Sequence, residues 1–137
     1  MVGQSPLPPR PQRPRPTVPY PAPSFELVVQ PAENHTQVVA VRGEIHVTTA
    51  GEFSRRFNEI LGRGRSRVVL DLSDTTFIDS TGLSVLLNSL RRINRNRGRL
   101  TIVCSNPTVL RLFHVTRLES TFDIVPTRDE ALARMQA

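Results

Sequence analysis

The hydroxyl of Ser80 is the group in this sequence whose surroundings most suggest chemistry. Residues 77–84 read Phe-Ile-Asp-Ser-Thr-Gly-Leu-Ser, between an expected strand over residues 67–72 and an expected amphipathic helix. The start of a helix presents unpaired backbone N–H groups and the positive end of the helix dipole. A hydroxyl placed there can cap the helix, and a phosphate is tolerated there as well. The local residues favour the cap, and a serine that accepts a phosphoryl group is the functional alternative.

Three aspartates around the same turn raise the question of a metal site. Asp71, Asp74 and Asp79 cluster around the end of the expected strand. Magnesium needs several converging oxygen ligands, and the chain has no lysine that could neutralise an acyl phosphate as receiver-type domains do. Asp74 is better explained as a turn residue before Thr75. We therefore expect no metal and no cofactor.

A serine hydrolase centred on Ser80 is also disfavoured. The nucleophile-elbow motif places glycines two residues before and after the serine, and Ile78 occupies the first of these positions. A general base would have to be one of the three histidines, His35, His46 or His114. His35 lies in a polar loop and His114 near the end of a short helix, and neither has an evident acidic partner in the sequence. No triad is assembled, and we expect that the chain is not an enzyme.

Short strands and helices alternate from Phe25 onward. Alternating or continuous apolar residues predict strands over 25–29, 37–41, 67–72, 100–104 and 122–125, and apolar residues at helical spacing predict helices after 49, 80, 106 and 127. The resulting order, ββαβαβαβα, predicts a single α/β domain. The crossovers within 67–104 require parallel neighbours, and the N-terminal hairpin makes the sheet mixed. Helices must then cover the apolar sheet.

Capping signals mark the starts of three helices. They are Thr49 with Glu52, Asn106 before Pro107, and Thr127 with Glu130. Glycines at 62 and 98 are expected to end the first two helices. Cys104, the one cysteine, follows an apolar strand and is expected to be a buried, inert thiol.

The N-terminal 24 residues have a different composition. Nine of the twelve prolines fall within residues 1–23. Proline fixes φ and removes a hydrogen-bond donor, so we expect residues 1–24 to form a disordered Pro/Arg-rich arm and residues 25–137 to form the folded domain. No segment approaches the ~20 apolar residues of a membrane span, and no secretory signal is apparent, so a cytoplasmic protein is expected.

The net charge of +6 comes from arginine alone, because the chain has no lysine. A strongly basic chain raises nucleic acid as a partner. Three of the arginines, Arg10, Arg13 and Arg15, lie in the arm, and residues 25–137 carry a net charge of only +3. The alternation of aromatic and basic residues that favours base stacking is also missing, so direct nucleic-acid binding is not expected.

The element order, together with Asp71-Leu-Ser and Phe77-Ile-Asp-Ser-Thr-Gly-Leu-Ser-Val-Leu, resembles the STAS domain of bacterial anti-sigma-factor antagonists. The Gly43-Glu44 step after the second strand and Cys104-Ser-Asn-Pro107 leading into Val109-Leu-Arg-Leu-Phe113 extend the resemblance over residues 25–137. It implies a STAS fold and a regulatory binding protein.

The resemblance also implies a switch at Ser80, the first serine after Asp79. In this family that serine is phosphorylated by the anti-sigma factor, itself a GHKL-type serine kinase that supplies the ATP site. The unphosphorylated antagonist binds the anti-sigma factor and frees sigma, and a PP2C-type phosphatase restores it after phosphorylation. The implied partner-binding residues are His46, Asp79, Ser80, Thr81 and Gly82.

His46 departs from the family pattern, in which an aspartate stands three residues beyond the glycine of the Gly-Glu step. A histidine could make partner binding pH-sensitive, and a simple surface substitution is the plainer interpretation. Two other functions stay open: a STAS module that is a scaffold or a subunit of another assembly without a switch, and a basic nucleic-acid-binding protein.

Overall fold

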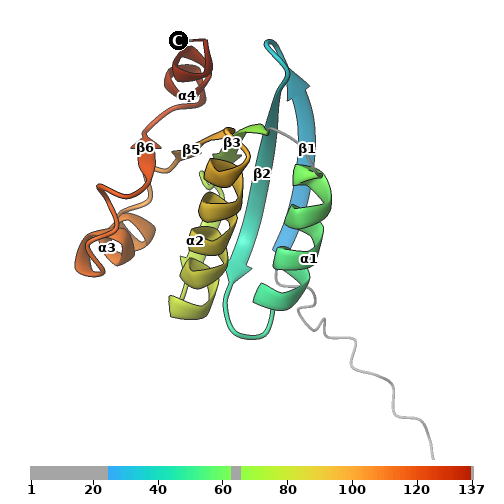
Figure 1. The fold of residues 1–137 in the computed structure, drawn as a ribbon. Helices are drawn as coiled ribbons and strands as arrows, with labels where there is room; N and C mark the ends of the chain where they lie inside the picture. Colours follow the sequence, from blue (N-terminus) through green and yellow to red (C-terminus); the bar gives the residue numbers. More distant parts are fainter. Residues whose placement is uncertain (1–24, 63–65, 137) are drawn as a thin grey trace, which may run out of the picture.

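The computed structural model describes residues 25–62 and 66–136. These residues form a six-stranded mixed sheet with helices on both faces (Figure 1). In chain order the elements are β1 (Phe25–Ala32), β2 (Thr36–Ile45), α1 (Ala50–Leu61), β3 (Arg67–Asp71), β4 (Thr75–Ile78), α2 (Ser80–Arg95), β5 (Arg99–Val103), α3 (Pro107–Val115), β6 (Asp123–Val125) and α4 (Arg128–Met135). The expected mixed α/β sheet covered by helices is confirmed.

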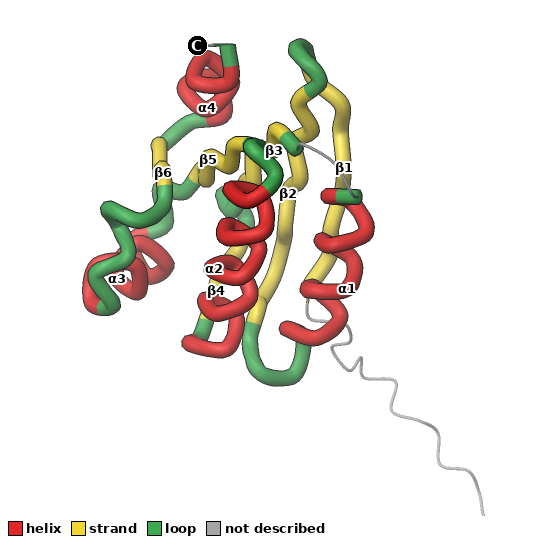
Figure 2. The backbone as a smooth tube through the Cα atoms, in the orientation of Figure 1, coloured by secondary structure: helices red, strands yellow, loops and turns green. Residues whose placement is uncertain are grey.

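The strands follow the order β1-β2-β3-β5-β6 across the sheet. β1 and β2 form the antiparallel hairpin, with Phe25 opposite Gly43, and the other pairs are parallel. Each parallel pair needs a crossover, which α1, α2 and α3 provide. The carboxyl ends of β2 and β4 and the start of α2 therefore meet at one end of the molecule, where the β2–α1 loop also lies (Figure 2).

Two separate cores lie on the two faces of the sheet because side chains alternate along each strand. In β2, Val39 and Val41 belong to the larger core, which α1, α2 and α3 cover. Val38 belongs to the smaller core, where it meets Ala131 and Met135 of α4. The expected burial of the helix faces is confirmed, including Phe53 and Phe57, whose rings stack in the larger core.

The structure adds a strand, β4, that the sequence pattern did not predict. β4 has four residues, of which only Thr75 and Ile78 are buried, so it shows neither alternation nor a continuous apolar run. It pairs with β2 beyond the point where β3 ends, with a register shift between Gly43 and Glu44. The turn expected at Asp74 is present, and it separates β3 from β4.

The capping box expected at Thr49 is wrong. Thr49 precedes α1 as predicted, but its hydroxyl donates to the Glu44 carbonyl at 2.9 Å and accepts from the His46 N–H at 3.0 Å, so it does not cap the helix. The other two caps are confirmed: Asn106 accepts from the Thr108 N–H at 2.9 Å, and Thr127 accepts from the Glu130 N–H at 3.2 Å.

Three further expectations concern the N-terminal arm, membrane-spanning helices and Cys104. The expected arm, residues 1–24, lies outside the described residues. Among the helices that the structure describes, none is both long and apolar enough to cross a bilayer. Cys104 is buried as expected, and burial raises the pKa of its thiol.

A candidate partner-binding surface at the start of helix α2

Ser80 is the first residue of α2 and is exposed, and the residue that caps the helix is Asp79. The backbone of Asp79 is extended, and its Oδ1 accepts a hydrogen bond from the Gly82 N–H at 2.9 Å. The interpretation of Ser80 as the cap is therefore wrong, because the aspartate one position earlier already fills that role. Within the described part of the chain, the Ser80 hydroxyl has no hydrogen-bond partner, which leaves it open to modification.

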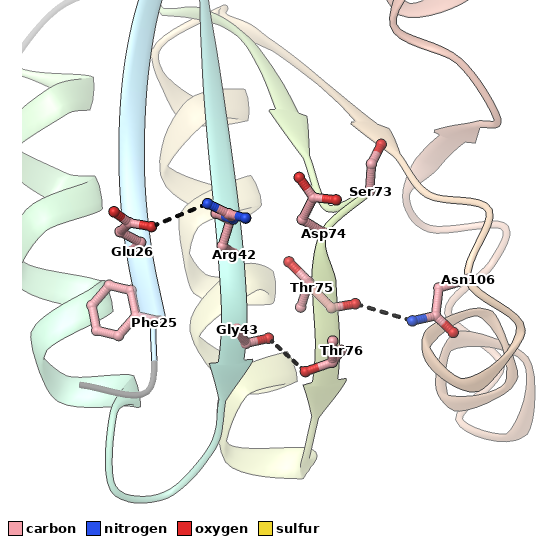
Figure 3. A pocket seen from close by; sticks show the side chains of 9 residues that line it. All are labelled: Phe25, Glu26, Arg42, Gly43, Ser73, Asp74, Thr75, Thr76 and Asn106. Carbon is pink, nitrogen blue, oxygen red and sulfur yellow. Dashed lines mark hydrogen bonds and ion pairs between the residues drawn. The ribbon is translucent and has the colours of Figure 1, made fainter. Parts of the chain in front are cut away.

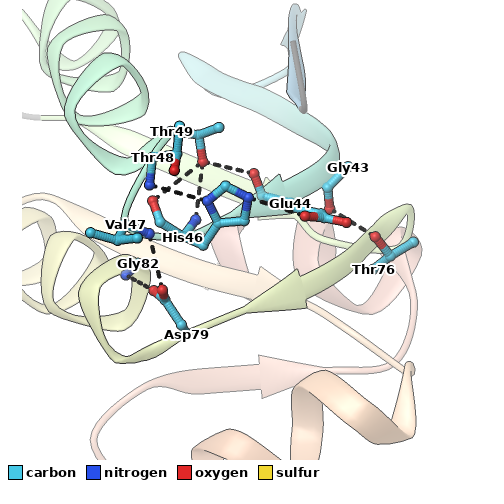
Figure 4. A network of polar contacts seen from close by, with 9 residues as sticks. All are labelled: Gly43, Glu44, His46, Val47, Thr48, Thr49, Thr76, Asp79 and Gly82. Atoms are coloured by element: carbon cyan, nitrogen blue, oxygen red, sulfur yellow. Dashed lines mark hydrogen bonds and ion pairs between the residues drawn. The ribbon is translucent and has the colours of Figure 1, made fainter. Parts of the chain in front are cut away.

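The second carboxylate oxygen of Asp79 fixes the neighbouring loop. Asp79 Oδ2 accepts from the Val47 N–H at 3.0 Å (Figure 4). The Asp79 N–H donates to the Ile45 carbonyl at 3.2 Å. Asp79 thus joins the end of β2, the β2–α1 loop and the start of α2. The structure brings together His46, Asp79, Ser80, Thr81 and Gly82, the five residues expected at the partner-binding site, at this one end of the domain.

His46 organises the β2–α1 loop. Its Nδ1 accepts from the Thr48 N–H at 3.2 Å, and its Nε2 lies 3.1 Å from Glu44 Oε1. These partners suit an imidazole with its proton on Nε2. The side chain is only 19% exposed, and its ring lies 6.2 Å from that of Phe77, centroid to centroid. His46 is therefore not a simple surface substitution, because both ring nitrogens hold the loop in place.

Gly82 allows the helix to start close to the end of β2. A Cβ at this position would lie 2.4 Å from the Ile45 carbonyl oxygen, far closer than such atoms can approach. The backbone of β2 cannot retreat easily, because the same Ile45 carbonyl accepts the Asp79 N–H. Gly82 therefore acts as a positioning residue for Ser80 and Asp79.

Two apolar side chains at this surface, Val47 and Phe77, were not among the residues predicted from the sequence. Val47 is 72% exposed and Phe77 is 42% exposed, although both are large and apolar. Val47 belongs to the loop that Asp79 holds, and Phe77 lies against His46. One sign of Val47's exposure is present in the sequence: it is an apolar residue in a loop, outside every expected strand and helix. Both side chains are therefore exposed at the end of the domain where α2 begins.

The arrangement does not support catalysis by Ser80. Both nitrogens of His46 are engaged in the loop, and His114 Nδ1 pairs instead with Glu119 Oε2 at 2.9 Å. The expectation that His114 has no acidic partner is therefore wrong, because Glu119 lies in the segment that follows α3. No general base is therefore in place beside the Ser80 hydroxyl among the residues that the structure describes.

The three aspartates near the turn serve separate purposes. Asp71 faces α4, where its Oδ2 accepts from Arg128 Nη2 at 2.6 Å, while Asp79 caps α2. Asp74 lines an open depression of about 640 Å³ on the face of the sheet (Figure 3). Across residues 25–62 and 66–136, no three metal-ligating side chains gather at one point.

The depression itself carries no catalytic set. Its lining combines polar and apolar surface and comprises Phe25, Glu26, Arg42, Gly43, Ser73, Asp74, Thr75, Thr76 and Asn106. Several of these groups satisfy one another: Arg42 pairs with Glu26 at 3.6 Å, Thr76 donates to the Gly43 carbonyl, and the Asn106 amide donates to the Thr75 carbonyl at 3.1 Å. The last bond ties α3 to β4, the strand that leads to Ser80.

Comparison with known proteins agrees with this geometry. Residues 28–131 match the family model of the STAS domain. The chain is 33% identical over 100 residues to an anti-sigma F factor antagonist of Paenibacillus polymyxa, covering 71% of this chain and 83% of the relative. It is 27% identical over 111 residues to an anti-sigma-F factor antagonist of Mycobacterium tuberculosis, covering 81% and 90%. The crystal structure of an anti-sigma factor antagonist from Mycobacterium paratuberculosis is similar with a TM-score of 0.75 at 29% identity, covering 83% of this chain and 96% of that one.

Proposed function

Because this chain belongs to the STAS domain family, we propose that it is an anti-sigma-factor antagonist whose binding to an anti-sigma factor is switched off by phosphorylation of Ser80. The relatives and the similar crystal structure named above are anti-sigma factor antagonists, and the chain spans most of the length of each. In this role Ser80 is a substrate residue and the domain is not an enzyme.

The observation that carries the proposal is the division of roles between Asp79 and Ser80. Asp79 caps α2 and fixes the β2–α1 loop, so the exposed hydroxyl of Ser80 contributes little to the fold. A kinase can therefore modify Ser80 without first breaking an internal hydrogen bond. The exposed side chains of Val47 and Phe77 provide the apolar contact area that a protein partner needs.

The charge that a phosphate adds explains how binding is lost while the fold stays intact. A phosphoserine carries about −1.5 to −2 charges at neutral pH. The helix N-terminus stabilises a negative group within the domain itself. Asp79 and Glu44 already place negative charge at the same surface, so the phosphate makes the surface repel any partner whose matching face is not strongly basic.

The partners follow from the same proposal. The anti-sigma factor is of the GHKL serine-kinase type and supplies the ATP and magnesium, and a PP2C-type phosphatase removes the phosphate. The domain then needs no cofactor of its own. These partners act on transcription, which puts the protein in the cytoplasm.

The first test locates the phosphate. The full chain is incubated with candidate anti-sigma kinases and ATP, and the product is mapped by peptide-level mass spectrometry. We expect modification of Ser80. Thr81, which is also exposed, is the nearest competing acceptor. Modification confined to Thr81 or to the N-terminal 24 residues would reject the assignment.

The second test measures the switch. Ser80→Ala should bind the anti-sigma factor as the wild type does and stay active permanently, whereas Ser80→Glu should bind more weakly. Ser120→Glu, in the exposed segment between α3 and β6, adds the same charge elsewhere and serves as the matched control. Equal affinities for all the Ser80 variants would contradict the charge switch and favour a scaffold or subunit of another assembly.

A further inference from the structure

The imidazole of His46 holds the β2–α1 loop in a form that only a neutral histidine supports. Its Nδ1 accepts from the Thr48 N–H at 3.2 Å, and its Nε2 lies 3.1 Å from Glu44 Oε1 (Figure 4). A ring nitrogen accepts a hydrogen bond only when it carries no proton. The ring is therefore neutral in this structure, with its proton on Nε2, where it can donate to the carboxylate.

Protonation of the ring changes only one of these two contacts. Histidine ordinarily gains a proton as the pH falls from about 8 to about 5. The Nε2 proton is present in both forms, so the contact with Glu44 is kept. The new proton occupies Nδ1, so the ring and Thr48 then present two N–H groups to each other. The Thr48 amide must turn away from the ring in the charged form.

The other bonds of the loop do not depend on the imidazole. The backbone N–H of His46 donates to Thr49 Oγ1 at 3.0 Å, and its carbonyl accepts from the Thr49 N–H at 2.9 Å. Asp79 Oδ2 holds the Val47 N–H. The change is therefore confined to the peptide between Val47 and Thr48. Both residues are exposed, so this peptide can rotate into water.

Few ionisable side chains surround the ring. Glu44 contacts it, and Asp79 is committed to the amides of the loop and of α2. β4 and the first half of α2 contain no ionisable side chain. Carboxyl groups ordinarily titrate at about pH 4, below the range of histidine. Charged pairs on the neighbouring elements are Glu52 with Arg55 at 3.4 Å on α1, and Glu26 with Arg42 at 3.6 Å on the β1–β2 hairpin.

We propose that protonation of His46 weakens binding of the anti-sigma factor, because it releases the Thr48 amide and reshapes the loop that presents Val47. This inference rests on the proposed function, since it adds a second input to the same surface. Val47 is the more exposed of the two apolar side chains there. A partner that fits Val47 in the loop of the neutral histidine fits it less well after the peptide rotates.

Asparagine at position 46 separates the hydrogen bond from the charge. An asparagine side-chain oxygen accepts readily from the N–H two residues later, which is the bond that His46 makes to Thr48. Asparagine does not change charge with pH, so His46→Asn keeps an acceptor and removes the titration. His114→Asn is the matched control, because His114 is a 77% exposed histidine on α3 that pairs with Glu119.

The first measurement uses the full chain alone. Proton–nitrogen correlation NMR spectra from about pH 8 to about pH 5.5 follow the imidazole nitrogens of His46 and the amide of Thr48. We expect the Nε2–H tautomer at the upper end and a Thr48 amide shift with the same midpoint as the His46 ring. That titration of Thr48 should disappear in His46→Asn and persist in His114→Asn. A Thr48 amide that does not respond to the ionisation of His46 would overturn the inference.

The second measurement compares affinities at about pH 8 and about pH 5.5. Its probe is the anti-sigma kinase that the phosphate mapping identifies, and the chain is unphosphorylated. The wild type and His114→Asn should bind on the order of fivefold more weakly at the lower pH, whereas His46→Asn should change by less than about twofold. An equal pH dependence in His46→Asn would assign the titrating group to the partner and overturn the inference. Equal affinities of the wild type at both pH values would overturn it as well.

Failure of the proposed function has a different signature. In that case neither the wild type nor His46→Asn binds a candidate anti-sigma kinase at either pH. Such a result would remove the partner named here, and the NMR titration alone would then decide whether the charge of His46 controls the loop.

Discussion

Asp79 and Val47 are 32 residues apart in the sequence, yet Asp79 Oδ2 accepts a hydrogen bond from the Val47 N–H at 3.0 Å. Asp79 also caps the helix that begins at Ser80. Ser80, the proposed phosphate acceptor, and Val47, the most exposed apolar side chain of the surface, are therefore positioned by one carboxylate. A partner that binds here meets a single preorganised unit.

The two functions of Asp79 can be separated by substitution. Asp79→Asn keeps an oxygen that can accept from the Gly82 N–H, but it loses a carboxylate that satisfies both amides. Asp79→Ala loses the cap as well, at a cost of about 0.5–2 kcal/mol in unfolding free energy. Urea denaturation should therefore rank wild type above Asn and Asn above Ala. Equal stability of all three would show that the carboxylate does not hold the two segments together.

Val47 should contribute to partner binding and not to folding. Val47→Asp places a charge on a side chain that is 72% exposed, so the unfolding free energy should change by less than about 0.5 kcal/mol. The affinity for the anti-sigma factor should fall on the order of tenfold if Val47 is near the centre of the interface. Val115→Asp is the matched control, because Val115 is 59% exposed on α3. Similar losses in the two variants would show that the effect is non-specific.

Gly82→Ala should destabilise the domain by about 1–3 kcal/mol, as expected for overpacking against a fixed backbone. The added Cβ would lie 2.4 Å from the Ile45 carbonyl oxygen, so the start of α2 must move. Gly51→Ala, in the first turn of α1, is the control, because nothing lies within 4 Å of the added Cβ and alanine has a higher helix propensity than glycine. Thermal unfolding should show a lower midpoint for Gly82→Ala and an equal or higher one for Gly51→Ala.

Asp71 should make stability depend on acid pH. Burial raises the pKa of its carboxyl, but hydrogen bonds from the Ser73 hydroxyl and amide and the contact with Arg128 outweigh burial and hold the pKa below its ordinary value of 3.8. The folded state then stabilises the ionised form. This contribution is fully present above the ordinary pKa and is lost as the pH falls through the lower pKa of the folded state.

Asp71→Asn should therefore be less stable than the wild type at neutral pH, by about 1–3 kcal/mol, because donors buried around the carboxylate lose their charged acceptor. The difference should shrink below pH 3.8. Urea denaturation at a series of pH values measures it. Asp74→Asn, at an exposed carboxylate nearby, should show no such loss. If the difference in unfolding free energy between Asp71→Asn and the wild type stayed constant down to the lowest pH measured, ionisation of Asp71 would not contribute to stability.

Removal of residues 1–23 should leave the domain folded. The described fold begins at Phe25, which packs edge-to-face against Phe53. Because the proline-rich segment has few donors for strand pairing, the melting temperature of the shortened chain should match that of the full chain. A fall of many degrees would show that the segment packs on the domain.

The sequence predicted those elements in which local pattern and tertiary packing agree. Leu83, Leu86 and Leu90 recur at helical spacing and are buried in α2. β4 could not be predicted, because its pairing depends on where β3 ends and on the irregularity after Gly43. The roles of Thr49 and Asp79 were missed for a similar reason. Each side chain forms hydrogen bonds with backbone groups that come close to it only in the folded chain.

The residues of the proposed partner-binding surface could be only partly predicted from the sequence. A motif identified Ser80 and its immediate neighbours, because these residues are consecutive in the sequence. Val47 and Phe77 were missed, since the exposure of an apolar side chain depends on which elements fail to cover it. The contacts of the His46 ring nitrogens with the Thr48 N–H and the Glu44 carboxylate were not predicted, because the sequence does not show that the loop brings these groups to the ring.

The position of Ser80 one residue inside the helix has an evolutionary consequence. Since Asp79 performs the capping, a mutation at position 80 leaves the helix cap intact, and under the proposed function it changes regulation alone. Under the proposed function, a gene duplicate can thus lose its switch by a substitution at this one position while it keeps the rest of the proposed docking surface. Descendants of such a domain can diverge into constitutive binders, and protein engineers can fix the on or off state by the same route.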